Sequence, residues 1–212
     1  MSISKGKEGR LSKAGVRDSK LLTRRKRLFL YDEICSLAEE VLTYSITNSE
    51  INEAMKSHIS INELEALNFA KLIDSLETQP SSVFLDSPDV ISERFGVRVG
   101  FFSQKRLLVQ GMKYLGQKPK AGSIKVISEH KADSRYPIVS GASIIAKVER
   151  DREIQRIEDI SGVEIGSGYP SDSYTLSAIR RDLAEGKLSQ YLRDQWQTMK
   201  SIRQLKMDEF IE

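Results

Sequence analysis

The chain contains little cysteine, histidine or tryptophan and no long apolar segment. Its single cysteine, Cys35, cannot form an internal disulfide, which indicates a reducing compartment and excludes a zinc site built from cysteines. The longest uninterrupted apolar run is four residues, at 28–31. A membrane helix needs roughly 20 apolar residues and a secretory signal about 7 to 15. We therefore expect a cytoplasmic protein with no membrane-spanning segment.

The composition is that of a globular protein with one domain, or with one domain and a small appendage. Hydrophobic residues make up 39% of the 212 residues and charged residues 30%, which excludes both wholesale disorder and a fibrous chain. The sequence also has no internal repeat and no low-complexity tract.

The net charge of +3 is distributed unevenly along the chain. Residues 1–27 carry ten basic and two acidic side chains, so the rest, with 23 basic and 28 acidic side chains, has a net charge of −5. A second basic stretch, residues 179–206, has a net charge of +4. Two basic regions on either side of an acidic centre suit a protein that binds a polyanion around a metal site. The alternative is that both regions are solvated helix faces.

Alternating helix and strand signals predict an α/β fold. Apolar residues recur at helical spacing in residues 24–40 and 61–76, and a long helix is expected from Pro137 to about residue 160. Strands are expected at 41–47, 83–85 and 123–127, with a weaker helix or loop after the second strand, up to about residue 115. From residue 173 onward the pattern is helical and broken at Gly186, which indicates a smaller helical appendage.

A carboxylate, Asp86, directly follows the short apolar strand at 83–85. The carboxyl ends of strands are where α/β sheets place their ligands, so this side chain is a candidate metal ligand. The alternative is that Asp86, followed by Ser and Pro, only forms a turn or caps a helix. Asp89 is a second candidate for that cap.

A second acidic candidate, Asp133, stands shortly before the helix that begins near Pro137. The positive end of that helix favours its ionised form. Within the helix, Lys147 and Arg150 are three residues apart and share a face from which they can reach a phosphate chain. The alternative is a surface loop for Asp133, and ion pairs with neighbouring acids for the two basic residues.

An aromatic candidate, Tyr169, follows two glycines in the segment GSGYPSD at 166–172. The glycines allow the backbone to present the ring outward, where it can stack on a sugar or a base. A tyrosine buried in a turn is the alternative.

Five segments together resemble ribonuclease HII of the archaeal type, in their order and in their separations. They are residues 15–20 (GVRDSK), 61–74 (INELEALNFAKLID), 83–90 (VFLDSPDV), 129–154 and 166–172. The resemblance covers nearly the whole chain. It implies a ribonuclease H-like α/β fold in residues 1–165, with a mixed central sheet between helices, and a carboxyl-terminal helical extension in residues 166–212 that helps to hold the duplex.

The resemblance also implies an activity: hydrolysis of the RNA strand of RNA/DNA hybrids, and cutting on the 5′ side of ribonucleotides embedded in DNA. The products would end in 3′-hydroxyl and 5′-phosphate. Catalysis would use two divalent ions, Mg²⁺ or Mn²⁺, and a monomer would suffice. By this resemblance Asp86 and Asp133 are catalytic metal ligands, two of the family's four acids. The substrate-binding residues it implies are Lys20, Arg24, Lys147 and Arg150 along the nucleic-acid path, and Tyr169 at the sugar of the RNA to DNA junction.

One part of the family pattern is absent from this sequence. The other two acids of the family belong to a segment Asp-Glu-Ala-Gly-Arg-Gly after a short apolar strand, and residues 7–10 (KEGR) match only a fragment of it. Residues 1–4 instead resemble the family's second strand, and residues 5–14 the hairpin that follows. We therefore expect the central first strand to be missing and Met1 to be an internal methionine of a longer reading frame.

The missing acids would weaken catalysis. Two carboxylates supply a charge of −2 against the +4 of two divalent ions, so we expect cleavage by this chain to be impaired. The alternative is a non-catalytic nucleic-acid-binding protein on the same fold, with its basic regions retained.

Overall fold

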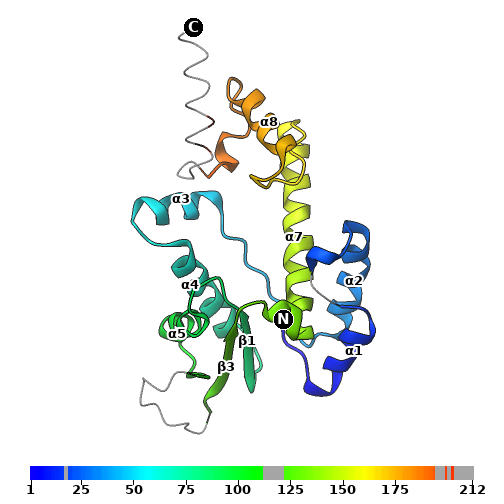
Figure 1. Ribbon diagram of the computed structural model, residues 1–212, viewed down its shortest axis with the longest axis vertical. Coiled ribbons are helices and arrows are strands. Elements are labelled where there is room, and N and C mark those ends of the chain that lie inside the picture. Colours follow the sequence, from blue (N-terminus) through cyan, green and yellow to red (C-terminus); the bar gives the residue numbers. More distant parts are fainter. Residues whose placement is uncertain (17–18, 112–121, 194–198, 200–201, 203–212) are drawn as a thin grey trace. The chain divides into compact units, whose positions relative to one another are not determined.

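The computed structural model describes residues 1–16, 19–111, 122–193, 199 and 202 (Figure 1). The chain divides into two compact units, which are described separately. One comprises Met1–Tyr44 and Asn62–Val148, and the other Ser45–Ile61 and Glu149–Glu212. None of the described helices is both long and apolar enough to cross a membrane.

A parallel three-stranded sheet is the centre of the first unit. Its order is β1 (Ser82–Asp86), β3 (Ile124–Glu129), β2 (Leu107–Val109), and both pairings are parallel. Four of the six residues of the central strand β3 are buried, Ile124 and Val126 fully, as expected for a parallel strand covered by helices. Instead of the mixed sheet that we expected, all three described strands are parallel.

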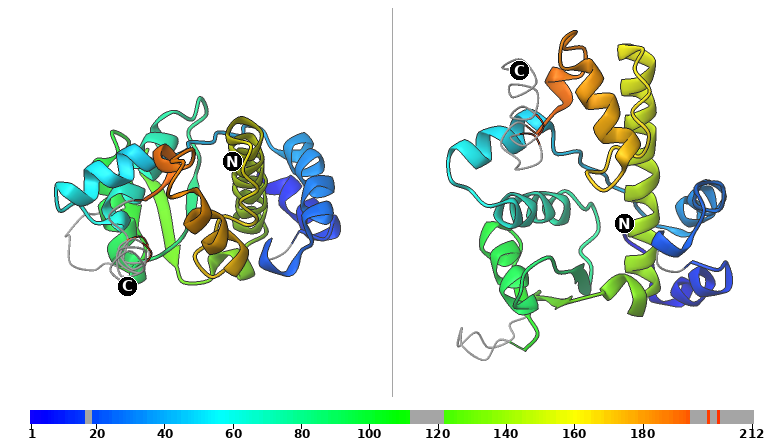
Figure 2. Two further views of the ribbon diagram at one scale, coloured as in Figure 1. Left: turned by 90° about the horizontal axis from the view of Figure 1, so that it is seen from above. Right: turned by 45° about the horizontal axis from the view of Figure 1, so that its top comes forward.

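Two helices, α4 (Ile61–Asp74) and α5 (Ser92–Phe102), cover one face of the sheet (Figure 2). Their buried residues form one hydrophobic cluster with those of the strands; its largest members include Phe95, Leu85 and Ile124. On the opposite face Phe84 lies against Tyr136, with ring centroids 4.7 Å apart. Tyr136 lies between α6 (Ala132–Arg135) and α7 (Pro137–Ser161), so both helices begin beside the sheet.

A second hydrophobic cluster of the first unit joins α1 (Glu8–Lys13) and α2 (Arg24–Leu37) to the first turns of α7. Leu30 and Ile34 of α2 and Ile144 of α7 have no exposed surface. The helix predicted in residues 24–40 is confirmed, but its buried face differs from the predicted stripe: α2 buries Leu30, Ile34 and Leu37, whereas Leu28 of that stripe is exposed. The short 3-10 helices η1 (Lys5–Lys7) and η2 (Ser19–Leu21) complete this part of the unit.

The second unit contains α3 (Asn48–Lys56), the end of α7, α8 (Ser173–Asp182) and the 3-10 helix η4 (Ser189–Tyr191). Ile157, Ile165 and Leu188 form its core. Asn48 and Asn52 of α3 donate side-chain hydrogen bonds to the carbonyl oxygens of Tyr191 and Leu192. The helical pattern predicted from residue 173 is confirmed in α8. Much of the rest of that segment, residues 194–198, 200–201 and 203–212, lies outside the described residues.

Two expectations for the amino-terminal half are wrong. Residues 41–47 form no strand, because no neighbouring strand pairs with them and Thr47 instead caps α3 in a capping box with Glu50. Residues 5–14 are helical in η1 and α1, where a hairpin was expected, because Leu11 turns into the hydrophobic cluster of α2. Of residues 1–4, only Ser2 makes a β contact, an isolated antiparallel bridge to Glu40.

Candidate active site

The first acidic candidate, Asp86, is the last residue of β1 and is exposed. Its strand partner in the register is Glu129, the last residue of β3. One carboxylate oxygen, Oδ1, accepts a hydrogen bond of 3.0 Å from the backbone N–H of Ala132. The carboxylate therefore lies at the carboxyl end of β1 and accepts the first backbone N–H of α6.

The second candidate, Asp133, follows Ala132 in the short helix α6. It is buried, with 5% of its surface exposed, and the Ser140 hydroxyl donates to its carbonyl oxygen. A cation faces its side chain, since Lys20 Nζ lies 3.9 Å from Asp133 Oδ2. Lys20 is itself placed by its neighbour Ser19, whose hydroxyl oxygen is 3.0 Å from that of Ser143 on α7.

The fold thus brings the two acidic segments side by side, although 46 residues separate Asp86 from Ala132. Carboxylates at the end of parallel strands can bind a hard cation, position water or repel anions. Within the part of the chain that the structure describes, no three His, Cys, Asp or Glu side chains converge closely enough to hold a metal ion.

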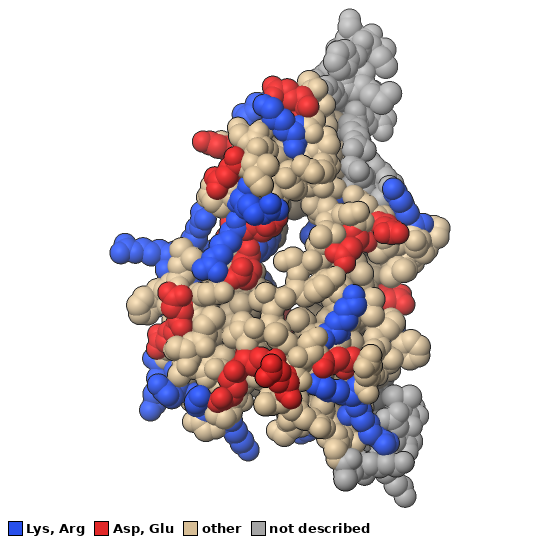
Figure 3. Space-filling model, turned by 180° about the vertical axis from the view of Figure 1, so that it is seen from behind, with Lys and Arg blue, Asp and Glu red and all other residues tan. Residues whose placement is uncertain are grey.

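The basic candidates of the first unit come from different elements. Arg24 is the exposed first residue of α2, where the Thr23 hydroxyl accepts the Lys26 N–H as a helix cap. Lys147 is partly buried on α7, next to the core residue Val148. Acidic and basic side chains are interspersed over the face in Figure 3. The uneven distribution of charge along the sequence therefore does not produce a surface patch of one sign on that face.

In the second unit the structure brings together Arg150 and Tyr169. The Arg150 guanidinium lies 3.8 Å from the centroid of the Tyr169 ring, and 42% of the tyrosine surface is exposed. The ring is thus held by a cation–π contact and is not buried in the turn.

The turn before Tyr169 is held by Asp172. Its carboxylate accepts hydrogen bonds from the hydroxyl and N–H of Ser167 and from the N–H of Tyr174. These bonds stabilise the ionised form, led by the Ser167 hydroxyl, and lower the pKa of Asp172 to about 2. Asp172 therefore stays charged over the whole physiological range.

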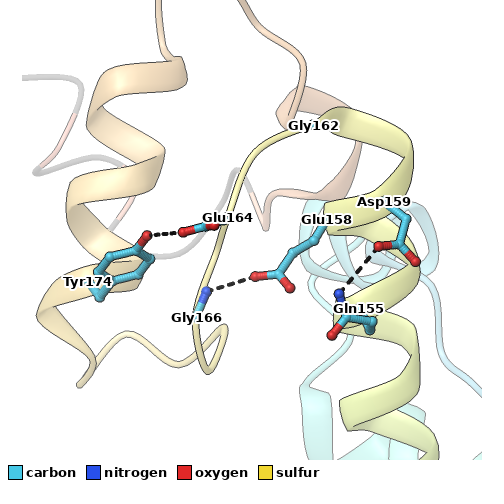
Figure 4. Close-up of a pocket in the computed structure, with 7 residues that line it drawn as sticks. All are labelled: Gln155, Glu158, Asp159, Gly162, Glu164, Gly166 and Tyr174. Atoms are coloured by element: carbon cyan, nitrogen blue, oxygen red, sulfur yellow. Dashed lines mark hydrogen bonds between the residues drawn. The ribbon is translucent and has the colours of Figure 1, made fainter.

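A pocket of about 460 Å³ in the same unit is lined mainly by acidic and polar groups (Figure 4). Glu158 Oε1 accepts the N–H groups of Ile165 and Gly166, at 2.6 and 3.1 Å. The Tyr174 hydroxyl donates to Glu164, which raises the pKa of that tyrosine. These carboxylates serve to hold the loop after α7. The lining residues are Gln155, Glu158, Asp159, Gly162, Glu164, Gly166 and Tyr174.

One acid that the sequence analysis did not single out, Glu129, holds the end of α6. Its Oε2 accepts from Arg135 at 2.6 Å and its Oε1 from the Tyr136 hydroxyl at 3.1 Å. Burial, followed by the bond to Glu129, raises the pKa of Tyr136. The only sequence signal for Glu129 is its place four residues before Asp133.

Comparison with known proteins agrees with this architecture. A sequence model of the family described as Ribonuclease HII matches residues 1–199. The chain belongs to the ribonuclease HII family. A relative named Ribonuclease HII, from Archaeoglobus fulgidus, is 38% identical over 204 residues, which cover 96% of this chain and 87% of that protein.

Solved structures of ribonuclease HII enzymes have the same fold. The ribonuclease H2 of Pyrococcus horikoshii OT3 superposes with a TM-score of 0.76 at 35% identity, covering 95% of this chain and 86% of that one. The Archaeoglobus fulgidus ribonuclease HII, solved in a complex with PCNA, gives a TM-score of 0.73 at 36% identity, over 92% of this chain and 84% of that one. The predictions of a ribonuclease H-like α/β fold and of a ribonuclease H enzyme are confirmed.

Proposed function

We propose that this ribonuclease HII is an endonuclease that hydrolyses the RNA strand of RNA/DNA hybrids and cuts DNA on the 5′ side of embedded ribonucleotides. The products carry 3′-hydroxyl and 5′-phosphate ends. The observation that supports this most is the hydrogen bond from Ala132 to Asp86, because it joins the segment of one acid to the segment of the other. We further propose that residues 1–165 form the catalytic domain and residues 166–212 the helical extension, a functional division that differs from the compact units, in which residues 45–61 and 149–165 belong to the second. We also propose that the enzyme acts as a monomer.

The donor set of Asp86 and Asp133 fits a divalent cation in part. Mg²⁺ in enzymes is often held by one or two carboxylates, with water and substrate phosphate completing its shell. Asp86 is exposed and Asp133 buried, and the Ala132 bond joins their segments, which is compatible with that pattern for one ion. A pair of Mg²⁺ or Mn²⁺ ions, when bound, would activate water and stabilise the leaving 3′ oxygen. Two carboxylates neutralise only half of the +4 charge of such a pair, so we expect slow cleavage.

The basic and aromatic side chains bind and orient the duplex in this proposal. Lys20 lies 3.9 Å from Asp133 and would contact the phosphate next to the acids. Tyr169, with its ring held by Arg150, would pack on the sugar at the RNA to DNA junction. Arg24 and Lys147 would contact phosphates further along the path.

The test is cleavage of an end-labelled DNA duplex that contains one ribonucleotide, with Mn²⁺ or Mg²⁺. We expect slow cutting 5′ of the ribonucleotide, and fragments that a DNA polymerase extends. Asp86→Asn and Asp133→Asn should each abolish cutting and leave duplex affinity within about threefold, because neither carboxylate is proposed to contact a base. Asp159→Asn is the matched control, because Asp159 is an exposed aspartate of α7 whose carboxylate accepts a hydrogen bond from the Gln155 side chain.

A non-catalytic nucleic-acid-binding protein is the second candidate. The observation in its favour is that no cluster of three potential metal ligands occurs among the described residues. Tight duplex binding with no cutting at any concentration of Mn²⁺ would support this candidate and reject the endonuclease.

A further inference from the structure

Three hydrogen bonds join the loop after β1 to the turn after β3. Ser87 N–H donates to the Glu129 carbonyl at 3.0 Å, and Ala132 N–H donates to Asp86 Oδ1 at 3.0 Å. The third bond, of 2.6 Å, joins His130 Nε2 to the carbonyl oxygen of Asp89. A carbonyl oxygen only accepts, so Nε2 carries the proton and donates it. Only this third bond uses a side chain that is not itself a proposed metal ligand.

Asp89, whose carbonyl oxygen accepts this bond, also contacts α5. Asp89 is buried, with 8% of its surface exposed, and its carboxylate Oδ2 lies 3.2 Å from Arg98 Nη1 on α5. Its N–H donates to the Ser87 hydroxyl at 3.2 Å. The loop is therefore held between α5 and His130, and Asp86 stands at its first position.

We infer that His130 is a positioning residue that sets the spacing of the Asp86 and Asp133 carboxylates. It lies in the turn between β3 and the helix that carries Asp133, and it bonds the loop that begins with Asp86. If that bond is lost, only the Ser87 and Ala132 hydrogen bonds hold the end of β1 to the turn, so the spacing between Asp86 and the helix that carries Asp133 is less firmly fixed. Groups that orient metal ligands in this way typically contribute about 10- to 100-fold to metal affinity or activity.

This inference rests on the proposed function, and the experiment separates the two. Isothermal titration with Mn²⁺, without nucleic acid, is compared for the unaltered chain, Asp86→Asn, His130→Ala and His130→Gln. We expect His130→Ala to weaken Mn²⁺ binding by about 10-fold. The glutamine amide can still donate to the Asp89 carbonyl, so His130→Gln should bind within about threefold of the unaltered chain.

The chain offers a matched control in its other histidine, His58, which is exposed in the second unit. His58→Ala and His58→Gln should leave Mn²⁺ affinity unchanged. Nitrogen-15 NMR of the unaltered chain and of His58→Gln gives a readout without metal: the neutral His130 ring should show the nitrogen shifts of the tautomer with its proton on Nε2.

The outcomes distinguish the positioning role of His130 from the proposed metal site at Asp86 and Asp133. Equal Mn²⁺ affinity in His130→Ala and the unaltered chain, with Asp86→Asn impaired, overturns the positioning role and leaves the proposed function standing. A neutral His130 ring with its proton on Nδ1 also overturns it. If Asp86→Asn binds Mn²⁺ as well as the unaltered chain, the metal site and the positioning role both fail. If His130→Ala does not fold, weak binding by a folded His130→Gln would still reject the inference.

Discussion

Adding one methyl group at Gly168 should destabilise the second unit more than the same change at Gly162. The two glycines have nearly the same positive φ, 69° and 68°. They differ in their surroundings. A Cβ at Gly162 has no atom within 4 Å, whereas a Cβ at Gly168 would lie 2.6 Å from Ile154 Cδ1 and 3.1 Å from Arg150 Nη2.

The expected losses of folding free energy follow from the positive φ of the two glycines and from the atoms around each of them. Alanine in the left-handed region costs about 1 kcal/mol, which should be the whole effect of Gly162→Ala. Gly168→Ala has the same backbone cost, and its Cβ also displaces the end of the Ile154 side chain and pushes the Arg150 guanidinium, which lies against the Tyr169 ring, by a few tenths of an ångström. Both atoms end flexible side chains, so overpacking should add about 1 kcal/mol, the low end of its usual range, for a total of about 2 kcal/mol.

Urea unfolding of both variants measures the free energies, and fluorescence anisotropy with a labelled RNA/DNA duplex measures binding. Gly168→Ala should also weaken duplex affinity by about fivefold, because an aromatic stacking contact is worth about 1 kcal/mol or more. Gly162→Ala should bind normally. Equal losses of stability in the two variants would refute the steric argument, and unchanged binding by Gly168→Ala would remove Tyr169 from the proposed interface.

Three other predictions test the core, the pH response and the phosphate path. Ile124→Ala removes a fully buried side chain of β3 and should lower the free energy of unfolding by about 2–5 kcal/mol in urea titrations; a loss below about 1 kcal/mol would contradict its place in the core. The pKa of Asp172 is about 2 when folded, against an ordinary 3.8, so its contribution to stability is complete above pH 3.8 and is lost as the pH falls towards 2. The chemical shift of the Tyr174 amide, which donates to Asp172, should change over the same pH range. Asp172→Asn should abolish that pH-dependent change. Lys20→Met and Arg24→Met should each reduce the slope of log affinity against log salt by about 1; an unchanged slope would exclude that residue from the phosphate path.

The elements that the sequence predicted correctly are those with a strong apolar period. The helices α2, α4 and α7 and the strands β1 and β3 each place apolar residues where a hydrophobic cluster buries them. The strand β2 was missed because three residues are too few for a period to show. Residues 41–47 have the alternation of a strand but no partner to pair with, and a single sequence does not reveal which segments pair.

The sequence singled out the two acids of the proposed site but not the residues that hold them in place. Asp86 was chosen because it ends an apolar strand, and Asp133 because it precedes a long helix within a family motif. The bond from His130 to Asp89 spans 41 residues and depends on the register of β1 against β3. Nothing local to either residue specifies that register, so the hydrogen bond between His130 and Asp89 could not be predicted from the sequence.

The parallel pairing of β1 with β3 also has a consequence for folding. Parallel neighbours need a long crossover, and here α5 and β2 lie between the two strands in the chain. The two acidic segments are therefore far apart in the unfolded chain and meet only after the sheet has formed. A ligand held by both acids binds the native state alone, and at 100 times its dissociation constant it would add about 2.7 kcal/mol to the stability. Protection from heat or protease by such a ligand would therefore report occupancy of the site even where turnover is too slow to measure.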